Sequence, residues 1–275
     1  MPKVDTDPAP TPALNRPIRS EDRVLHGDCL NIMPTLQLFD LVFADPPFNI
    51  DQNYQEFKDV NPDYSKWTWD WLDLAWGRTK GVMAIHGPDH LMDILILWAN
   101  ARGVLGKRVA WVNWHYQFGQ CTSSNWVDGR CHLMIFANNP KKYTWNPDSI
   151  RVKSLRATEY HDKRIHDTEK GGMRVPCTVW GIPIDGQYWG RVTGNSEERR
   201  PDHPNQLPER YLERVILAYT NKGDLILDPF GGSGTTMVVA EELKRVCYTI
   251  ETSKMACASI RDRLKKGTVR VKLGN

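Results

Sequence analysis

One stretch decides the fold of this 275-residue chain, and it reads Leu225-Ile226-Leu227-Asp228-Pro229-Phe230-Gly231-Gly232-Ser233-Gly234-Thr235-Thr236. An apolar run ends in an acidic residue, a glycine-rich turn follows, and residues 235–244 then show helical periodicity. A strand, a glycine-rich turn and a helix N-terminus together form a cradle for a nucleotide or nucleoside. The turn is not a Walker A loop, since no lysine follows Gly234, and Met237 stands where a dinucleotide fingerprint needs its third glycine.

Short apolar runs alternate with amphipathic stretches on either side of this turn. We interpret as strands the runs Val24–His26, Phe39–Ala44, Gly81–His86, Val109–Asn113, His132–Phe136, Asp224–Leu227 and Val246–Ile250. Helical periodicity fits residues 66–78, 89–102, 206–221, 235–244 and 253–266. This alternation predicts an α/β fold with a mostly parallel sheet and helices on both faces. Ligands bind at the carboxyl ends of the strands in such a sheet, so the loops there hold the candidate site residues.

The composition is that of a globular protein and argues against a membrane protein. The chain is 40% hydrophobic and 25% charged, and its mean hydropathy is -0.52. The longest apolar stretch, residues 91–101, contains Asp93 and is too short to span a bilayer. The six cysteines form no C-x-x-C pair, which argues against a zinc knuckle and a disulfide scaffold. Because we find no apolar signal-peptide region, we expect a cytoplasmic protein with reduced thiols, in a bacterial cell or in a host cell if a phage encodes it.

Three segments depart from the regular pattern. Residues 1–20 hold five of the eighteen prolines and are predicted to be a disordered tail, and residues 267–275 are predicted to be a second tail. Residues 141–200 lack long apolar runs, so we interpret them as an insertion in a core formed by residues 21–140 and 201–266. The insertion has twelve Lys and Arg against eight Asp and Glu, whereas the whole chain has a net charge of +3. The positive charge is therefore concentrated in a segment able to neutralise phosphates.

A second loop, Asp45-Pro46-Pro47-Phe48, follows the run Phe39–Ala44. Its prolines remove two backbone donors, so the loop presents a carboxylate, an unpaired Pro46 carbonyl and an aromatic face together. Two acceptors match the two N–H bonds of an exocyclic amine, and Phe48 matches the flat face of a base. The residues alone leave a second interpretation open, in which the prolines only form a turn after a strand.

Acidic residues also follow two other predicted strands. Glu251 comes directly after Val246–Ile250, where it either accepts bonds from two ribose hydroxyls or lies in a solvated helix N-terminus. Asp28 follows Val24–His26, and it either caps a helix or accepts a bond from an adenine amine.

Together these loops resemble motifs of the amino-methyltransferases of DNA, which transfer a methyl group from S-adenosylmethionine to adenine N6 or cytosine N4. Residues Asp45–Phe48 are similar to their catalytic D-P-P-Y/F motif, and residues 228–236 are similar to their cofactor motif. Residues 203–209 resemble the segment H-P-x-Q-K-P-E, with Leu207 in place of the usual lysine, and residues 27–29 match an early G-D-C segment.

The resemblance covers about residues 22–266 and places the catalytic motif before the cofactor motif, the order called the beta class. This order implies a circularly permuted Rossmann-like methyltransferase sheet with an inserted target-recognition segment. The strands at 224–228 and 246–250 would be the first and second of the unpermuted sheet, and those at 24–26 and 39–44 the third and fourth. All four strand ends would still meet at one crevice.

The resemblance also implies a role for each matching residue. Asp45 and the Pro46 carbonyl would hold the target amine and Phe48 would stack on the base, so the catalytic residues are Asp45, Pro46, Pro47 and Phe48. The cofactor S-adenosyl-L-methionine would be bound by Asp28, Asp45, His203, Asn205, Gln206, Asp228, Phe230, Gly231, Gly232, Ser233, Gly234, Thr235 and Glu251. No metal is implied. Members of the family carry target recognition in the insertion, so the expected DNA contacts are Lys141, Lys142, Arg151, Lys153, Arg156, Lys163, Arg164, Arg199 and Arg200.

The expected activity is methylation of adenine N6 in a base flipped out of double-stranded DNA. Cytosine N4 is the nearest alternative, although N4 enzymes more often have serine where Asp45 stands. A nicotinamide oxidoreductase would leave residues 45–48 unexplained, and the intact loops argue against an inactive DNA-binding relative. A homodimer and a cognate restriction enzyme are both compatible with the sequence.

Overall fold

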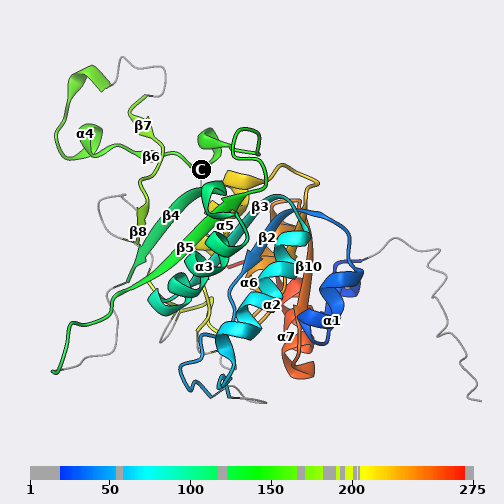
Figure 1. Ribbon diagram of the computed structural model, residues 1–275. Helices are drawn as coiled ribbons and strands as arrows, with labels where there is room; N and C mark the ends of the chain where they lie inside the picture. The colour runs from blue at the N-terminus through cyan, green and yellow to red at the C-terminus, as the bar shows by residue number, and fades with distance from the viewer. Residues whose placement is uncertain are drawn as a thin grey trace, which may run out of the picture.

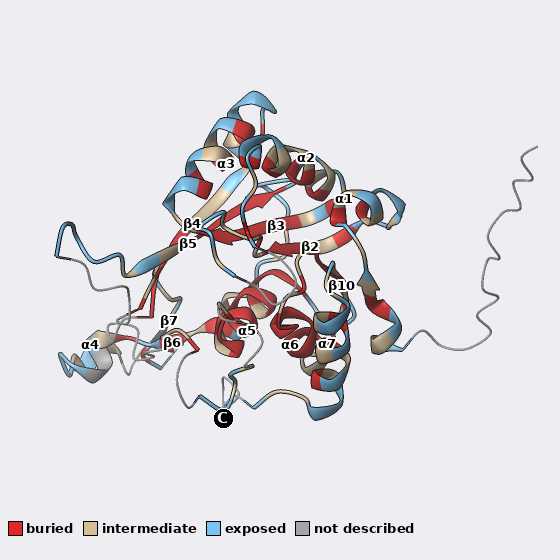
Figure 2. Cartoon of the chain, turned by 90° about the horizontal axis from the view of Figure 1, so that it is seen from below, coloured by how far each residue is buried: buried red, intermediate tan, exposed pale blue. Residues whose placement is uncertain are grey.

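The computed structural model describes residues 19–53, 58–116, 123–165, 171–181, 190–192, 196–200, 203 and 205–269. Most of each predicted tail, residues 1–18 and 270–275, lies outside the described residues. The described chain is built around one large mixed sheet with helices on both of its faces (Figure 1). Figure 2 shows α1, α2 and α3 over one face and α5, α6 and α7 over the other.

The sheet has eight strands in the described residues, and each expected strand overlaps one of them. They are β1 (Val24–His26), β2 (Phe39–Ala44), β3 (Thr79–Gly87), β4 (Arg108–His115), β5 (Arg130–Ala137), β8 (Val179–Trp180), β9 (Leu225–Asp228) and β10 (Val246–Glu251). The two-residue strands β6 (Val152–Lys153) and β7 (Met173–Arg174) form a separate small sheet.

The five expected helices are also present. The helices are α1 (Cys29–Ile32), α2 (Tyr64–Gly77), α3 (Asp89–Ala101), α4 (Leu155–Thr158), α5 (Glu209–Tyr219), α6 (Thr235–Glu242) and α7 (Lys254–Lys266). Helix α5 begins three residues later than the periodicity predicts. Pro208 is its N-cap in an extended conformation, and a proline disfavours helical conformation in the residue before it.

The order of strands is β1-β10-β9-β2-β3-β5-β4-β8. The first five of these are parallel, β5 is antiparallel to both of its neighbours, and β8 runs parallel to β4. The last two strands of the chain therefore lie between β1 and β2, which come first in the sequence. This order confirms the predicted α/β fold with its permuted, mostly parallel sheet.

The hydrophobic core has two parts, one on each face of the sheet. In β2, Leu41 and Phe43 pack with residues of α5 and α6, whereas Val42 and Ala44 pack with residues of α2 and α3. Successive side chains of a strand point to opposite faces, so a strand covered on both sides is apolar throughout. None of the described helices combines the length and the apolar character needed to cross a membrane.

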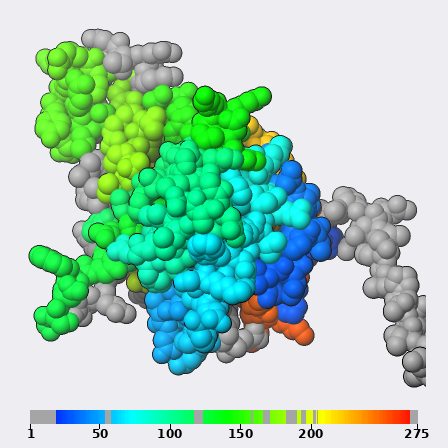
Figure 3. Space-filling view, in the orientation of Figure 1, coloured from blue at the N-terminus to red at the C-terminus, as the bar shows by residue number. Residues whose placement is uncertain are grey.

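The described part of the insertion leaves the sheet at the edge where the parallel strands begin. Ala137, at the end of β5, pairs with Val82 near the start of β3, and the Asn146 N–H donates to the Ala218 carbonyl near the end of α5. The β6–β7 lobe, which we define as residues 151–165 and 171–174, stands out from the body (Figure 3). In Figure 1 this lobe lies at the upper left, whereas the loop that follows β2 lies at the bottom. The chain returns to the sheet as β8, which pairs with β4.

Candidate active site

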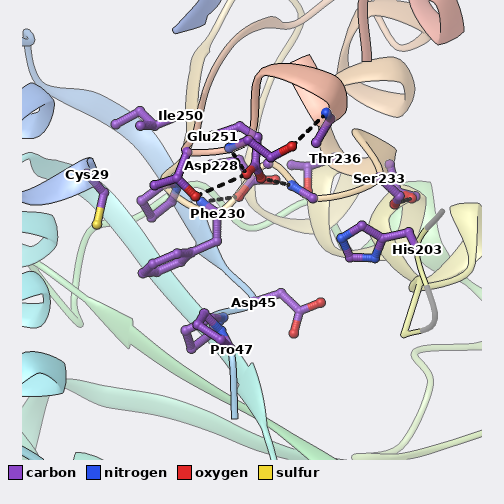
Figure 4. Close-up of a pocket in the computed structure, with 18 of the residues that line it drawn as sticks. Cys29, Asp45, Pro47, His203, Asp228, Phe230, Ser233, Thr236, Ile250 and Glu251 are labelled. Atoms are coloured by element: carbon purple, nitrogen blue, oxygen red, sulfur yellow. Dashed lines mark hydrogen bonds between the residues drawn. The ribbon is translucent and has the colours of Figure 1, made fainter. Parts of the chain in front are cut away.

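A cavity of about 300 Å³ lies where β1, β2, β9 and β10 end (Figure 4). The loop after each of these strands contributes to its wall, as the predicted topology requires. The expected residues that line it are Asp28, Asp45, Pro46, Pro47, Phe48, His203, Asn205, Gln206, Asp228, Phe230, Gly231, Gly232, Ser233, Thr235 and Glu251. Gly234 is outside this lining and instead is the N-cap of α6.

The glycine-rich turn is fixed to the end of β10. The Gly231 N–H donates to the Ile250 carbonyl at 2.8 Å, and the Gly232 N–H donates to Glu251 Oε2 at 2.8 Å. Gly232 has a φ of +49°, and a Cβ added there would lie 2.7 Å from His203 Nε2. The turn therefore needs glycine at this position both for its backbone conformation and for the close approach of His203.

Glu251 is held in the cavity wall through both carboxylate oxygens. Oε2 accepts the bond from Gly232, and Oε1 accepts a bond of 2.8 Å from the Ser253 N–H. Ser253, and not Glu251, is the N-cap of α7. Because the carboxylate is oriented by the backbone, it can accept further bonds from a ligand without rearranging.

Asp28 combines the two roles that the sequence left open. It is the N-cap of α1, where its Oδ1 accepts a bond of 2.9 Å from the Leu30 N–H, and it also lines the cavity. Cys29 lies beside it at the same end of the cavity (Figure 4).

Asp45 and Asp228 are two carboxyl groups in poorly hydrated surroundings. Burial raises the pKa of Asp45 well above its usual range, and the nearby Asp228 carboxyl raises it further. Burial also raises the pKa of Asp228 to about 7, although bonds from the Thr236 hydroxyl and the Phe230 N–H act in the opposite direction. The cavity thus favours a ligand whose positive charge stabilises carboxylates.

Two carbonyls of the loop Asp45–Phe48 have partners. The Pro47 carbonyl accepts a bond of 2.8 Å from the Tyr64 hydroxyl, and His90 Nε2 lies 2.6 Å from the Phe48 carbonyl. No described residue donates a hydrogen bond to the Pro46 carbonyl. The side chain of Asp45 and the carbonyl of Pro46 are therefore two acceptors in adjacent residues of the cavity lining.

Aromatic rings support this loop from behind. The ring of Phe48 lies 6.1 Å from that of His86, whose Nδ1 is 2.9 Å from the Tyr211 hydroxyl. Burial lowers the pKa of His86 to about 3, so this ring is neutral. Trp114 and Tyr211 are buried and contact His86 and each other. Phe48 therefore packs against a cluster of buried, uncharged rings.

The sequence did not identify every residue of the lining. Trp67 of α2 reaches the cavity and contacts Phe230 at a ring separation of 5.8 Å, but a tryptophan in an amphipathic helix carries no signal of this role. Ser253, Met255 and Ala256 line the wall at the start of α7, and the rule that ligands meet strand ends would have found them.

The expected DNA contacts separate into two groups. Seven of them lie in the segment that follows β5 and in the β6–β7 lobe, away from the cavity, and most are exposed (Figure 1). They are Lys141, Lys142, Arg151, Lys153, Arg156, Lys163 and Arg164. Arg156 and Arg164 both bond to Asp162, and Arg151 bonds to Asp148. Arg199 is exposed next to the cavity, and Arg200 lines it.

The fold and the site define a methyltransferase that uses S-adenosylmethionine. The chain matches the N6/N4 DNA methylase family over residues 39–262, and it therefore belongs to that family. It is a DNA methyltransferase, and the cofactor of the family is S-adenosylmethionine. This assignment removes the nicotinamide oxidoreductase from the alternatives.

Individual relatives agree with the family. The chain is 28% identical to the Type II methyltransferase M.HpaI of Haemophilus parainfluenzae, over 89% of this chain and 74% of that protein. It is also 28% identical to the DNA adenine methyltransferase YhdJ of Escherichia coli, over 79% of this chain and 74% of that protein. The solved structure of the cytosine-N4-specific PvuII DNA methyltransferase has the same fold, with a TM-score of 0.58, 17% identity and coverage of 88% of this chain and 92% of that one.

The cavity fits the cofactor of the family. Carboxyl groups of Asp28, Asp45, Asp228 and Glu251 line it, which suits a sulfonium cation and ribose hydroxyls. Its volume is at the lower end of the range usual for small-molecule sites. No group of three or more His, Cys, Asp or Glu side chains that could hold a metal ion occurs in the described ranges.

Proposed function

We propose that this enzyme methylates the exocyclic N6 of adenine in double-stranded DNA, on a base flipped out of the helix. The observation that carries the proposal is the pair of acceptors formed by the Asp45 carboxylate and the Pro46 carbonyl. An adenine amine has two N–H bonds, and each acceptor takes one of them. Because the N6 atom is inaccessible in a stacked duplex, the base must leave the stack at a cost of a few kcal/mol.

The acceptors also act on the reactivity of the amine. The nitrogen lone pair of an exocyclic amine is delocalised into the ring, which makes it a poor nucleophile. Two hydrogen bonds in the loop favour a pyramidal nitrogen, and they strengthen as positive charge develops on it during transfer. The cofactor supplies the electrophilic methyl group, so no covalent enzyme intermediate is needed. Phe48 stacks on the base and positions it.

Two features favour adenine over cytosine. Asp45 stands where cytosine-N4 enzymes more often have serine, and one relative with 28% identity is an adenine methyltransferase. The likeness to the cytosine-N4-specific enzyme is one of fold alone. Incubation with duplex DNA and cofactor followed by nucleoside mass spectrometry should yield N6-methyladenine. If N4-methylcytosine formed in its place, the cytosine alternative would be correct.

Asp45→Ala is the direct test of the catalytic role. We expect methylation to fall by about 100- to 1,000-fold, the size seen when a group that stabilises developing charge is removed. Cofactor binding should stay measurable by calorimetry, because most of the lining is unchanged. The control is Asp93→Ala, at an exposed position on α3. Wild-type methylation rates in the Asp45 variant would rule out this mechanism.

The partners are proposed on the same basis. The relatives include Type II methyltransferases, which is the restriction-modification context. We also propose a cognate restriction enzyme, a homodimer and a cytoplasmic location. These three proposals rest on the proposed methylation of DNA.

A further inference from the structure

Arg200 is the one Lys or Arg in the described lining of the cavity. The same lining contains four carboxyl groups, from Asp28, Asp45, Asp228 and Glu251. Leu207, at the position where similar sequences have lysine, also lines the cavity but is buried and uncharged. The charge of Arg200 is therefore distinctive within the cavity, and its place there differs from the DNA contact that the sequence led us to expect.

The Arg200 side chain makes no hydrogen bond or salt bridge that involves its Nε in the described part of the chain, although its charge helps to lower the pKa of the exposed Asp262. The Arg200 Nε is shielded from solvent, and no salt bridge joins the side chain to a described residue. Arg263, which lies in the same region, has Glu209 as an ion-pair partner at 2.8 Å. A buried N–H without an acceptor costs free energy, so an anionic ligand group here would stabilise the arrangement.

The backbone around Arg200 is held firmly in place. Gln206, which is 4% exposed, accepts a bond of 3.0 Å from the Arg200 N–H and donates one of 2.7 Å to the Glu198 carbonyl. Glu198 in turn accepts a bond of 2.8 Å from the Glu209 N–H at the start of α5. The segment that carries Arg200 is thus tied to a helix before any ligand binds, which lowers the cost of ordering it.

The cavity extends in two directions from Glu251. One direction leads to Cys29, and the other leads to Ser233 and His203 (Figure 4). Asp28 precedes Cys29 in the chain and also lines the cavity. Arg200 is at the second end, because the His203 N–H donates to the Arg200 carbonyl at 3.1 Å. The lining thus has the Asp28 carboxyl group at the first end and the Arg200 side chain at the second.

S-adenosylmethionine has a matching difference between its ends. Its adenine end has an amine that donates hydrogen bonds, and its methionine end has a carboxylate. A carboxylate near Asp28 would meet like charge, whereas near Arg200 it would meet a cation whose buried Nε–H has no acceptor. We infer that Arg200 binds the methionine carboxylate of the cofactor and thereby sets the direction in which the cofactor lies in the cavity. This inference rests on the methyltransferase function but does not depend on which base is methylated.

The test compares two ligands that differ at the methionine end. S-adenosylhomocysteine has the carboxylate, and 5′-methylthioadenosine lacks the whole amino-acid portion. In calorimetry with Arg200→Gln, we expect the Kd of S-adenosylhomocysteine to rise by about 10- to 100-fold, as for loss of a hydrogen bond to a charged group. The Kd of 5′-methylthioadenosine should change by less than about twofold. Arg200→Lys should give an intermediate Kd for S-adenosylhomocysteine, because it keeps the charge and loses the planar fork.

Arg210→Gln is the matched control, since Arg210 lies on the first turn of α5 outside the lining. It should leave the affinity for both ligands unchanged. Equal weakening of both ligands by Arg200→Gln would indicate a structural role and overturn the inference, as would unchanged binding of S-adenosylhomocysteine. If Arg200→Gln does not fold, the two ligands are compared in Arg200→Lys. A wild-type protein that bound S-adenosylhomocysteine but methylated no adenine would contradict the proposed function, and the ligand comparison would still decide the role of Arg200.

Discussion

At the scale of single residues, Asp228 is subject to opposing effects. The Thr236 hydroxyl and the Phe230 N–H stabilise its carboxylate, whereas burial favours its neutral form. Burial is the larger effect, so the pKa rises to about 7. Near neutral pH the free enzyme is therefore a mixture of protonation states at this position, and a bound cation would shift the mixture toward the carboxylate.

The raised pKa predicts how stability depends on pH. The folded protein holds a proton on Asp228 that the unfolded chain releases above the usual value of 3.8. The contribution of this group to stability is therefore complete below that value and is lost as pH rises toward about 7. Asp228→Asn cannot titrate, so its free energy of unfolding should fall less steeply over this window. Denaturant unfolding at a series of pH values measures the difference.

The comparison reports on Asp228 together with its effect on Asp45, because the Asp228 carboxyl also raises the pKa of that neighbour. Parallel pH profiles would contradict a raised pKa for the coupled Asp45 and Asp228 carboxyl groups. Measurements should be made without cofactor, since a bound sulfonium would lower the pKa of the carboxyl.

At the scale of elements, the glycine-rich turn joins three parts of the chain. It follows β9, starts α6, and is bonded to Glu251 at the end of β10. His203 approaches it from the segment before α5. A substitution in the turn is therefore expected to displace Glu251 and His203, which also line the cavity.

Gly232→Ala tests this point against Gly103→Ala. Both glycines have positive φ, but a Cβ at Gly103 meets no atom within 4 Å, whereas one at Gly232 would overlap His203. Gly103→Ala should cost about 1 kcal/mol of stability from backbone strain alone. Gly232→Ala should cost about 1–3 kcal/mol and also weaken cofactor binding, because His203 must move. Thermal unfolding and calorimetry give the two quantities, and equal effects of the two substitutions would contradict the role of His203 in the wall.

Elements with strong local signals could be predicted from the sequence. The β9–turn–α6 unit and the loop at Asp45 have short motifs with a direct physical meaning, and the order of these motifs indicated the permuted sheet. The position of Arg200 could not be predicted, because it depends on how residues 196–206 fold back onto α5. Its charge alone looked like that of the other basic residues in the insertion. The two-residue strand β8 is too short to have an alternating pattern.

At the scale of the whole molecule, the cavity and the point where the chain leaves for the β6–β7 lobe lie at opposite ends of the parallel strands. The cavity is at the carboxyl ends of the parallel strands, and the chain leaves for the lobe from their amino ends. The basic residues of the lobe are in part paired with Asp148 and Asp162. We therefore propose that the insertion binds DNA mainly through its last residues, near Arg199, which adjoin the cavity.

Salt dependence of DNA binding distinguishes the two ends of the insertion. Each phosphate contact adds about one unit to the slope of log K against log salt concentration. Arg199→Gln should reduce this slope by about one unit, whereas Arg156→Gln with Arg164→Gln should reduce it by less. Fluorescence anisotropy with a labelled duplex at several salt concentrations measures both slopes. A reduction of about two units in the double variant would show that the duplex reaches the lobe.

The strand order also bears on how the protein is made at the ribosome. In the described sheet, β1 pairs with β10, and β2 pairs with β9 on one side. These two early strands can therefore form their pairs only after β9 and β10 have been synthesised. Until these emerge, the nascent chain exposes unpaired strand edges, which are sites of aggregation. The glycine-rich turn also follows β9, so a fragment that ends before β9 has the loop Asp45–Phe48 but lacks the turn that lines the cavity. We therefore expect a fragment that ends before β9 to methylate no DNA.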